Sequence, residues 1–210
     1  MAKAGSTGEI YRVAGPVVTA TGLRPRMYDV MFAGDEELMG EVIGLAGDKT
    51  IIQVYEETSG LRPGEKVLDS GQPLVVELGP GLLGSIFDGI QRPLPTLVDR
   101  MGDYILRGVR ANALDRTKEW AFAPRVRQGD EVTGGQVIGT IPEAEHVEHR
   151  VLAPPNVHGT VKDAREGTVN VEDVVVSLDD GTDLRPMQAW PVRRGRPVKE
   201  RLTPSIPLVT

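Results

Sequence analysis

The fold is decided by residues 8–20, which read GEIYRVAGPVVTA. A run of β-forming residues ends at Gly15-Pro16, and a second run, Val17 to Ala20, begins directly after it. Short runs of this kind, separated by turn residues, are typical of strands joined by tight connections. Further runs of the same type lie at 28–32, 38–45 and 49–56, with Gly-Asp turns at 34–35 and 47–48. Residues 1–74 are therefore predicted to form a small closed β-barrel.

The composition supports a mainly β fold. The chain has 210 residues, of which 40% are hydrophobic but only 4% aromatic, so its cores must be built from aliphatic side chains. It contains 25 Gly and 16 Pro, which favours short strands and turns over long helices. A length of 210 residues suits one large domain or two small ones.

Charge and cysteine content exclude several classes of protein. The formal net charge is −6, whereas a general nucleic-acid binder is usually basic. The chain has no cysteine, which excludes disulfides, thiolate metal sites and cysteine nucleophiles. No apolar run approaches the roughly 20 residues that span a bilayer. We therefore expect no direct membrane insertion, so a partner would have to hold the protein at any membrane where it works.

Residues 75–115 are predicted to be a connector with two short helices. Leu82, Leu83, Ile86 and Phe87 recur at helical spacing and predict the first helix. Thr96 is the expected cap of the second, which would run to Met101. The same region contains G-x-G-x-x-G at residues 79–84, the pattern of a dinucleotide-binding turn.

A dinucleotide site also requires a βαβ unit and an acidic residue about 20 positions later, for which Asp103 is the candidate. Pro93 and Pro95 interrupt the crossover that such a unit needs, so a glycine-rich turn is the preferred interpretation. A phosphate-binding P-loop needs Gly-Lys followed by Ser or Thr, and the chain has no Gly-Lys dipeptide. The sequence therefore predicts no catalytic residue, no cofactor-binding residue and no ATP binding by this chain.

Residues 116–190 are predicted to form a second β-rich domain. Alternating apolar residues and turn glycines lie at 126–139, 151–155, 159–161 and 169–178, and Asp179 to Thr182 predict a turn between strands. The first three stretches resemble the strand pattern of biotinyl and lipoyl carrier domains, which indicates a barrel-sandwich-like fold. A carrier or interaction module without nucleotide binding is thus an alternative function, although Lys162 is expected within a strand and not at an exposed hairpin tip.

The sequence contains two charged clusters, one with two histidines and one with three arginines. His146 and His149 would meet on one helical turn and bind a metal, but a solvated loop fits the surrounding β pattern better, so no metal site is predicted. Arg193, Arg194 and Arg196 form a basic run without interleaved aromatic residues, and contact with an acidic neighbouring domain is preferred over nucleic-acid binding. Residues 191–210 have the composition of a linker, which we expect to lead to a further domain.

Five segments carry a joint pattern: GEIYRVAGPVV at 8–18, QVYEETSGL at 53–61, VELGPGLL at 76–83, IFDGIQRPL at 86–94 and WPVRR at 190–194. Together they resemble one family, the catalytic A subunit of archaeal and vacuolar-type rotary ATPases. The resemblance covers essentially the whole chain. It implies that residues 1–74 belong to a crown ring of alternating A and B subunits, and that residues 116–190 are an insertion absent from the B subunits.

The resemblance also implies a role. The chain would be a non-catalytic N-terminal portion of the A subunit of a proton-translocating rotary ATPase, with B subunits and stator subunits as partners. Its place would be cytoplasmic and peripheral to the cell membrane. The enzyme activity, ATP and magnesium would belong to the parent protein, whose nucleotide-binding domain is expected after the linker.

Overall fold

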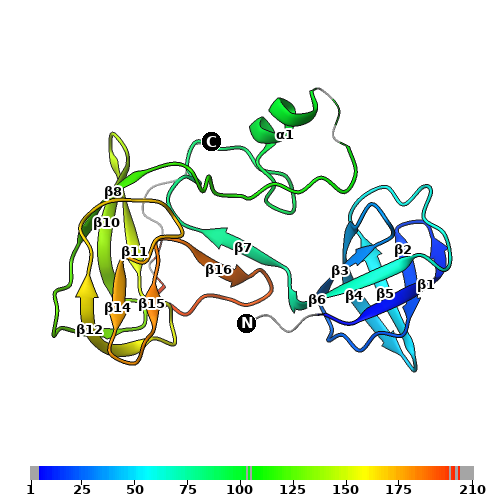
Figure 1. Cartoon of the computed structure of the whole chain (residues 1–210), viewed down its shortest axis with the longest axis horizontal. Coiled ribbons are helices and arrows are strands. Elements are labelled where there is room, and N and C mark those ends of the chain that lie inside the picture. The colour runs from blue at the N-terminus through cyan, green and yellow to red at the C-terminus, as the bar shows by residue number, and fades with distance from the viewer. Residues whose placement is uncertain (1–4, 103, 105, 199, 202, 204–210) are drawn as a thin grey trace.

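The chain forms two β modules joined by a connector, as seen in the computed structural model (Figure 1). The structure describes residues 5–102, 104, 106–198, 200, 201 and 203. Asp103 and nine residues of the expected linker, 199, 202 and 204–210, lie outside the described residues. Strands dominate, so the prediction of a mainly β fold is confirmed.

The first module is a closed barrel with the strand order β1-β2-β5-β4-β3-β6, in which every pair is antiparallel. Its strands are β1 (Thr7–Ala14), β2 (Val17–Thr21), β3 (Asp29–Ala33), β4 (Leu38–Ala46), β5 (Lys49–Val54) and β6 (Lys66–Pro73). Closure leaves no unpaired sheet edge, which is how a small barrel satisfies its backbone hydrogen bonds. The predicted small closed barrel is thus confirmed.

The barrel has its own hydrophobic core. Alternate residues of each strand point inward, because successive side chains of a strand lie on opposite faces. The inward set is almost wholly aliphatic, as the composition predicted. It consists of Ile10, Val18, Ala20, Met31, Ala33, Leu38, Val42, Ile52, Val54 and Val67, and Leu23, which follows β2, joins the same cluster.

The second module consists of two four-stranded sheets, β11-β10-β8-β13 and β15-β14-β12-β9. Its strands are β8 (Trp120–Pro124), β9 (Glu131–Thr133), β10 (Val137–Ala144), β11 (Val147–Leu152), β12 (His158–Ala164), β13 (Gly167–Val169), β14 (Val176–Leu178) and β15 (Asp183–Leu184). A separate buried cluster fills the space within it, including Phe122, Val132, Ile138 and Ile141. The prediction of a second, barrel-sandwich-like β module is confirmed.

A two-stranded ribbon links the two modules. β7 (Val75–Leu78) follows the barrel directly and pairs antiparallel with β16 (Gln188–Pro191), which follows the second module. This pairing was not predicted, because a single sequence carries no signal for partners that lie more than 100 residues apart. The chain therefore leaves the barrel and returns toward it along adjacent strands (Figure 1).

The connector contains one helix, α1 (Leu94–Met101), among the residues described. The helix predicted through Leu82 and Phe87 is wrong: the backbone there makes turns, with Gly81 at φ 105 and Gly84 at φ 77. Positive φ angles are incompatible with a right-handed helix, and glycine adopts them readily. Thr96 was also wrongly expected as a cap, since it lies inside α1, whose N-cap is Pro93.

The glycine-rich turn is not part of a βαβ unit. β7 precedes it and pairs with the antiparallel strand β16, and within the described residues no parallel strand pair occurs. The dinucleotide hypothesis therefore lacks the structural context that it requires. The eight residues of α1 are too few to cross a membrane, and no other helix is described.

Candidate functional site at the seam between barrel and connector

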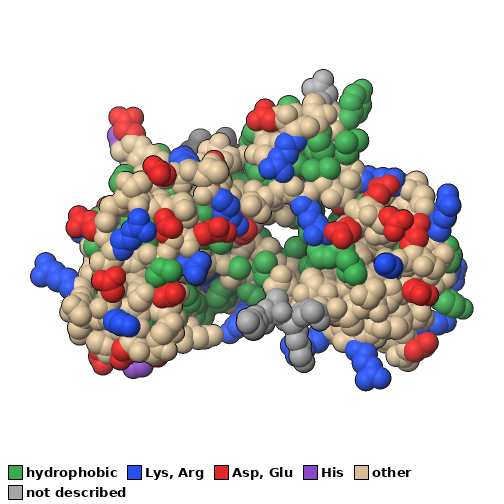
Figure 2. Space-filling model, in the orientation of Figure 1, with side chains coloured by type: hydrophobic (Ala, Val, Ile, Leu, Met, Phe, Trp, Pro, Cys, Tyr) green, Lys and Arg blue, Asp and Glu red, His purple; other side chains and the backbone are tan. Residues whose placement is uncertain are grey.

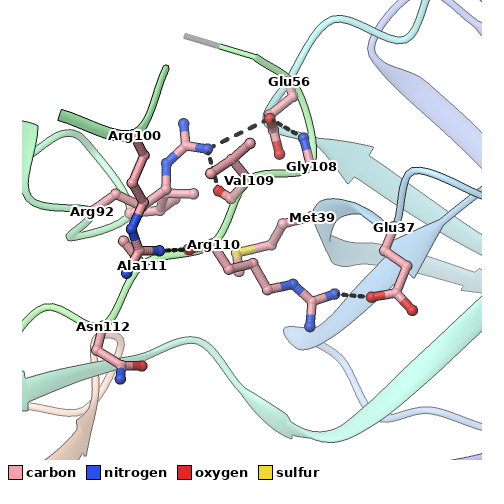
Figure 3. A pocket seen from close by; sticks show the side chains of 11 residues that line it. Glu37, Met39, Glu56, Arg92, Arg100, Gly108, Val109, Arg110, Ala111 and Asn112 are labelled. Carbon is pink, nitrogen blue, oxygen red and sulfur yellow. Dashed lines mark hydrogen bonds and ion pairs between the residues drawn. The ribbon is translucent and has the colours of Figure 1, made fainter. Parts of the chain in front are cut away.

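The connector is attached to the barrel by arginines that pair with barrel carboxylates, and we call this contact the barrel–connector seam. Arg92 lies at its centre (Figure 3). Its Nε donates to Asp88 at 2.6 Å, and its Nη1 donates to the Val109 carbonyl at 3.0 Å and lies 3.6 Å from Glu56 of the barrel. The Arg92 and Glu56 side chains are both largely buried. One guanidinium thus joins the 88–92 turn, the chain at 109 and the barrel.

Gly108 completes the same contact through its backbone. Its N–H donates to Glu56 Oε2 at 2.9 Å (Figure 3), and its φ is +70. A Cβ at this position would lie 2.2 Å from the carbonyl oxygen of Glu36. Only glycine permits both this backbone conformation and this close approach to the barrel.

Two further arginines extend the seam. Arg107 donates to Glu36 at 2.9 Å and to the carbonyls of Glu57, at 3.1 Å, and Ser59. Arg110 donates to Glu37 at 2.6 Å, and its guanidinium lies 3.8 Å from the centre of the Phe32 ring. These outer pairs are more exposed than Arg92 and Glu56, so solvent screens them and each contributes little alone.

A cavity of about 300 Å³ lies within the seam and is lined by Glu37, Met39, Glu56, Ile90, Arg92 and residues 108–112 among others. Of its charged lining groups, Glu37 pairs with Arg110 and Glu56 lies beside Arg92, whose other partner, Asp88, lies outside the lining. Burial raises the pKa of Asp88, but hydrogen bonds from the Arg92 guanidinium and from backbone N–H groups outweigh that effect and leave the pKa below its usual value. A carboxylate held ionised in this way is a weak general base at neutral pH. The arrangement fits mechanical attachment better than acid–base chemistry.

The predicted basic run makes its contacts within the chain. Arg193 forms a two-point pair with Glu41 of β4, through Nε to Oε1 at 2.8 Å and through Nη2 to Oε2, and its guanidinium lies 4.4 Å from the centre of the Tyr28 ring. Tyr28 has φ 71, a conformation that is rare and strained for a bulky residue. Arg194 and Arg196 lie over the Trp190 ring. Arginines 193, 194 and 196 thus contact one acidic side chain, Glu41, and two aromatic side chains, Tyr28 and Trp190.

The segment that enters the second module, residues 114–116, contacts strand β7 of the ribbon, and we call this place the base of the module. Arg116 pairs with Glu77 of β7 and with Glu172, at 2.8 Å. Glu77 also accepts from the Leu114 N–H at 3.1 Å. These contacts fix the point at which the chain enters the second module.

The histidines and the lysine that the sequence singled out do not form one site. His146 lies at the exposed turn between β10 and β11, whereas His149 is partly buried with its Nδ1 at 3.3 Å from Glu143 Oε2. Within the described ranges, no cluster of three or more His, Asp or Glu is placed to hold a metal ion. Lys162 is exposed within β12, not at a hairpin tip, so its placement does not favour a carrier function.

The seam was not predicted from the sequence. Its arginines and glutamates are individually ordinary surface residue types, and they pair across separations of 48 to 73 residues for Arg107 and Arg110. The one local signal is the spacing of Asp88 and Arg92, which are four residues apart. Taken together, the closed barrel, the second β module and the arginine-paired seam define a two-module β protein whose connector is fastened to the barrel, and comparison with known proteins identifies its family.

Two family models match the chain. The model described as ATP synthase alpha/beta family, beta-barrel domain, matches residues 10–71, and the model of the barrel-sandwich domain of the ATPsynthase alpha/beta subunit matches residues 111–193. The chain is 57% identical over 203 residues to the A subunit of the A-type ATP synthase of Methanosarcina barkeri, and 58% identical over 203 residues to that of Methanosarcina mazei. It is 54% identical over 205 residues to the A subunit of the A-type ATP synthase of Halobacterium salinarum.

The chain belongs to the ATP synthase alpha/beta family and is homologous to the N-terminal region of the A subunit of A-type ATP synthases. The resemblance read from the sequence is thereby confirmed. Each of these three alignments covers 97% of this chain but only 35% of the relative. The chain thus spans about a third of the length of the curated relatives it matches.

Proposed function

We propose that this chain is a non-catalytic N-terminal portion of the A subunit of a proton-translocating rotary ATPase, and that it serves assembly of the head formed by A and B subunits. The observation that carries this proposal is the identity of 57% over 97% of the chain, which includes both modules and the connector. In this role the protein is cytoplasmic and peripheral to the membrane, where the other subunits of the complex hold it.

The barrel offers a lateral surface for neighbouring subunits. Its outer wall carries exposed apolar side chains, with Tyr11 56%, Ile43 41% and Leu45 49% exposed. A contiguous exposed apolar patch is a feature of interaction surfaces, and Ile43 and Leu45 lie two residues apart on β4. In the proposed assembly this wall contacts the barrels of adjacent B subunits.

The connector offers a second apolar surface. Figure 2 shows hydrophobic side chains gathered around α1, where Val98 is 51% exposed, and Leu106 nearby is 60% exposed. In the proposed assembly this surface packs on the nucleotide-binding part of the same parent protein. The second module projects away from the barrel (Figure 1), a position suited to contact with stator subunits.

Nucleotide chemistry is assigned to other parts of the parent protein. The sequence has no Gly-Lys dipeptide and so no P-loop lysine for phosphates. We therefore propose that the isolated chain binds neither ATP nor magnesium. Isothermal titration calorimetry with Mg-ATP tests this directly, and a micromolar affinity would contradict it.

The assembly role is tested with a chimera. The corresponding N-terminal third of the Methanosarcina mazei A subunit is replaced by this chain and co-expressed with its B subunit, and assembly is measured by size-exclusion chromatography with mass determination. The proposal expects assembled A/B complexes. A matched chimera with Ile43→Asp and Leu45→Asp on the outer barrel wall should remain folded but assemble poorly. Failure of the unmodified chimera to assemble, although both proteins are folded, would refute the assembly role.

A further inference from the structure

Glu143 is a buried carboxylate that joins two parts of the chain. It lies near the end of β10 in the second module, and its side chain is only 5% exposed. Its Oε1 accepts from the backbone N–H of Gly81 at 2.7 Å and from that of Leu83 at 3.3 Å. Its Oε2 lies 3.3 Å from His149 Nδ1 on the adjacent strand β11.

The two backbone donors belong to the glycine-rich turn that matches G-x-G-x-x-G. Gly81 has φ 105, and the N–H groups of residues 81 and 83 both donate to one carboxylate oxygen, so the turn forms a concave site for an anion. A Cβ at Gly81 would lie 3.4 Å from Trp120 Cζ2, so this turn packs closely on the second module. The motif therefore does bind an anionic group, and the group is the protein's own carboxylate.

Besides the apolar contacts that Leu82 and Leu114 make with its core, polar contacts hold the second module to the rest of the chain at two places. One is its base, where β7 pairs with β16 and Arg116 pairs with Glu77. The other is the contact of Glu143 with residues 81 and 83. Glu143 lies near the end of β10, which begins at Val137. A single two-stranded ribbon permits twisting and bending, and a second point of attachment removes that freedom.

We propose that Glu143, together with the N–H groups of Gly81 and Leu83, is a latch that fixes the orientation of the second module on the connector, and that the β7–β16 ribbon is the hinge about which the module turns when the latch opens. Because a charged acceptor strengthens hydrogen bonds from backbone donors, the latch depends on the carboxylate and not only on the shape of the side chain. His149 orients that carboxylate through its second oxygen.

The experiment measures both the local contact and the orientation in the 210-residue chain. Hydrogen–deuterium exchange reports on the Gly81 and Leu83 amides. The chain has no cysteine, so Arg62→Cys on the barrel and Glu166→Cys on the second module can be spin-labelled selectively, and their distance distribution measured by pulsed electron paramagnetic resonance. Both positions are exposed.

With Glu143→Ala, the latch predicts exchange at residues 81 and 83 that is faster by about tenfold or more, and a broader distance distribution. Glu143→Gln, which keeps an oxygen acceptor but no charge, should give a smaller change in the same direction. Glu145→Gln on the exposed turn of the same hairpin is the matched control and should change neither. Protection of Ile138 and Ile141 shows whether the module itself remains folded.

Each possible outcome decides either the contact of Glu143 or its role in orienting the module. Faster exchange with an unchanged distance distribution would overturn the latch, because the module would then be oriented by the ribbon alone. Unchanged exchange in Glu143→Ala would overturn the contact itself. If Glu143→Ala lowers the protection of the module's core, the module itself is perturbed and Glu143→Gln becomes the deciding variant. Wild-type exchange and wild-type distances in Glu143→Gln would then refute the proposal.

Discussion

Arg193 and Glu41 lie 152 residues apart in the sequence, yet they form a two-point ion pair between the segment after β16 and strand β4 of the barrel. The Glu41 side chain is only 3% exposed, so it depends on its partner for compensation of its charge. This pair attaches the chain to the barrel after its passage through the second module, whereas the seam attaches it before that passage.

Removal of Arg193 should alter how stability depends on pH. The Arg193 hydrogen bond, which outweighs burial, holds the pKa of Glu41 below its usual value. A carboxyl group with a lowered pKa stabilises the fold above its unfolded-state pKa of about 4.5, and this stabilisation is lost as the pH falls through the folded-state pKa.

Arg193→Ala should therefore lower stability at pH 7 more than at pH 4, in urea unfolding followed by circular dichroism. Arg193→Lys should give an intermediate result, because lysine lacks the fork geometry that contacts both carboxylate oxygens. Arg194→Ala, next in the chain, is the control. Equal losses of stability for Arg193→Ala at the two pH values would contradict the assigned coupling.

Gly108→Ala should open the barrel–connector seam. The new Cβ would meet the Glu36 carbonyl at 2.2 Å in a backbone conformation with φ +70. We expect a loss of about 2 kcal/mol or more in unfolding free energy, from strain and displacement of the Glu56 contact. Gly89→Ala is the control for a glycine that has neither a positive φ nor an atom within 4 Å of its Cβ position, and it should change stability by less than about 0.5 kcal/mol. Similar stabilities for the two variants would show that the seam tolerates displacement.

His149 should make the second module sensitive to mild acid. Burial lowers the pKa of His149, and the nearby Glu143 carboxylate offsets this only in part. A histidine with a lowered pKa contributes stability that is complete above the unfolded-state value of about 6.5 and is lost as the pH falls through the folded-state pKa.

Thermal unfolding measured from pH 7.5 down to pH 5 should therefore show a decline below about pH 6.5 that is smaller in His149→Gln. His146→Gln, at the exposed turn of the same hairpin, should retain the wild-type decline. Identical profiles for wild type and His149→Gln would exclude this histidine as the source.

The two hydrophobic clusters should respond independently to cavities. Ile52→Ala in the barrel and Ile138→Ala in the second module each remove a fully buried side chain, at a cost of about 2–5 kcal/mol. Both tryptophans, Trp120 and Trp190, lie outside the barrel, so their fluorescence reports on the rest of the chain. Ile138→Ala should shift the fluorescence transition and leave hydrogen exchange in the barrel core unchanged. Ile52→Ala should speed hydrogen exchange in the barrel core and leave the fluorescence transition unchanged. A common shift in both would indicate a single cooperative unit.

The sequence revealed local structure well and distant pairing poorly. The barrel strands were visible because β-branched runs and Gly-Asp turns alternate along residues 8–56. The error at Leu82 to Phe87 has a physical cause: helical spacing of apolar residues was read across Gly81 and Gly84, whose backbone conformations end any helix there. Apolar spacing describes a helix only where the backbone can follow it.

The candidate seam and the contacts of Glu143 were beyond reach of the sequence for a different reason. An arginine or glutamate carries no mark of its partner in the sequence, and Arg92 and Glu56, which lie 3.6 Å apart, belong to the connector and to the barrel. The glycine-rich motif was correctly interpreted as a turn, but nothing local showed that a carboxylate more than 60 residues later would occupy it.

The pairing of β7 with β16 has a consequence for how such a chain can change over evolutionary time. Leu78 and Gln188 are register partners on neighbouring strands, so the residues between them form a closed excursion whose two ends already meet. Such an excursion can be lengthened, exchanged or shortened without moving the ends apart, and the barrel need not be rebuilt to accommodate it. The ribbon thus marks a junction at which whole modules can be gained or lost as cassettes.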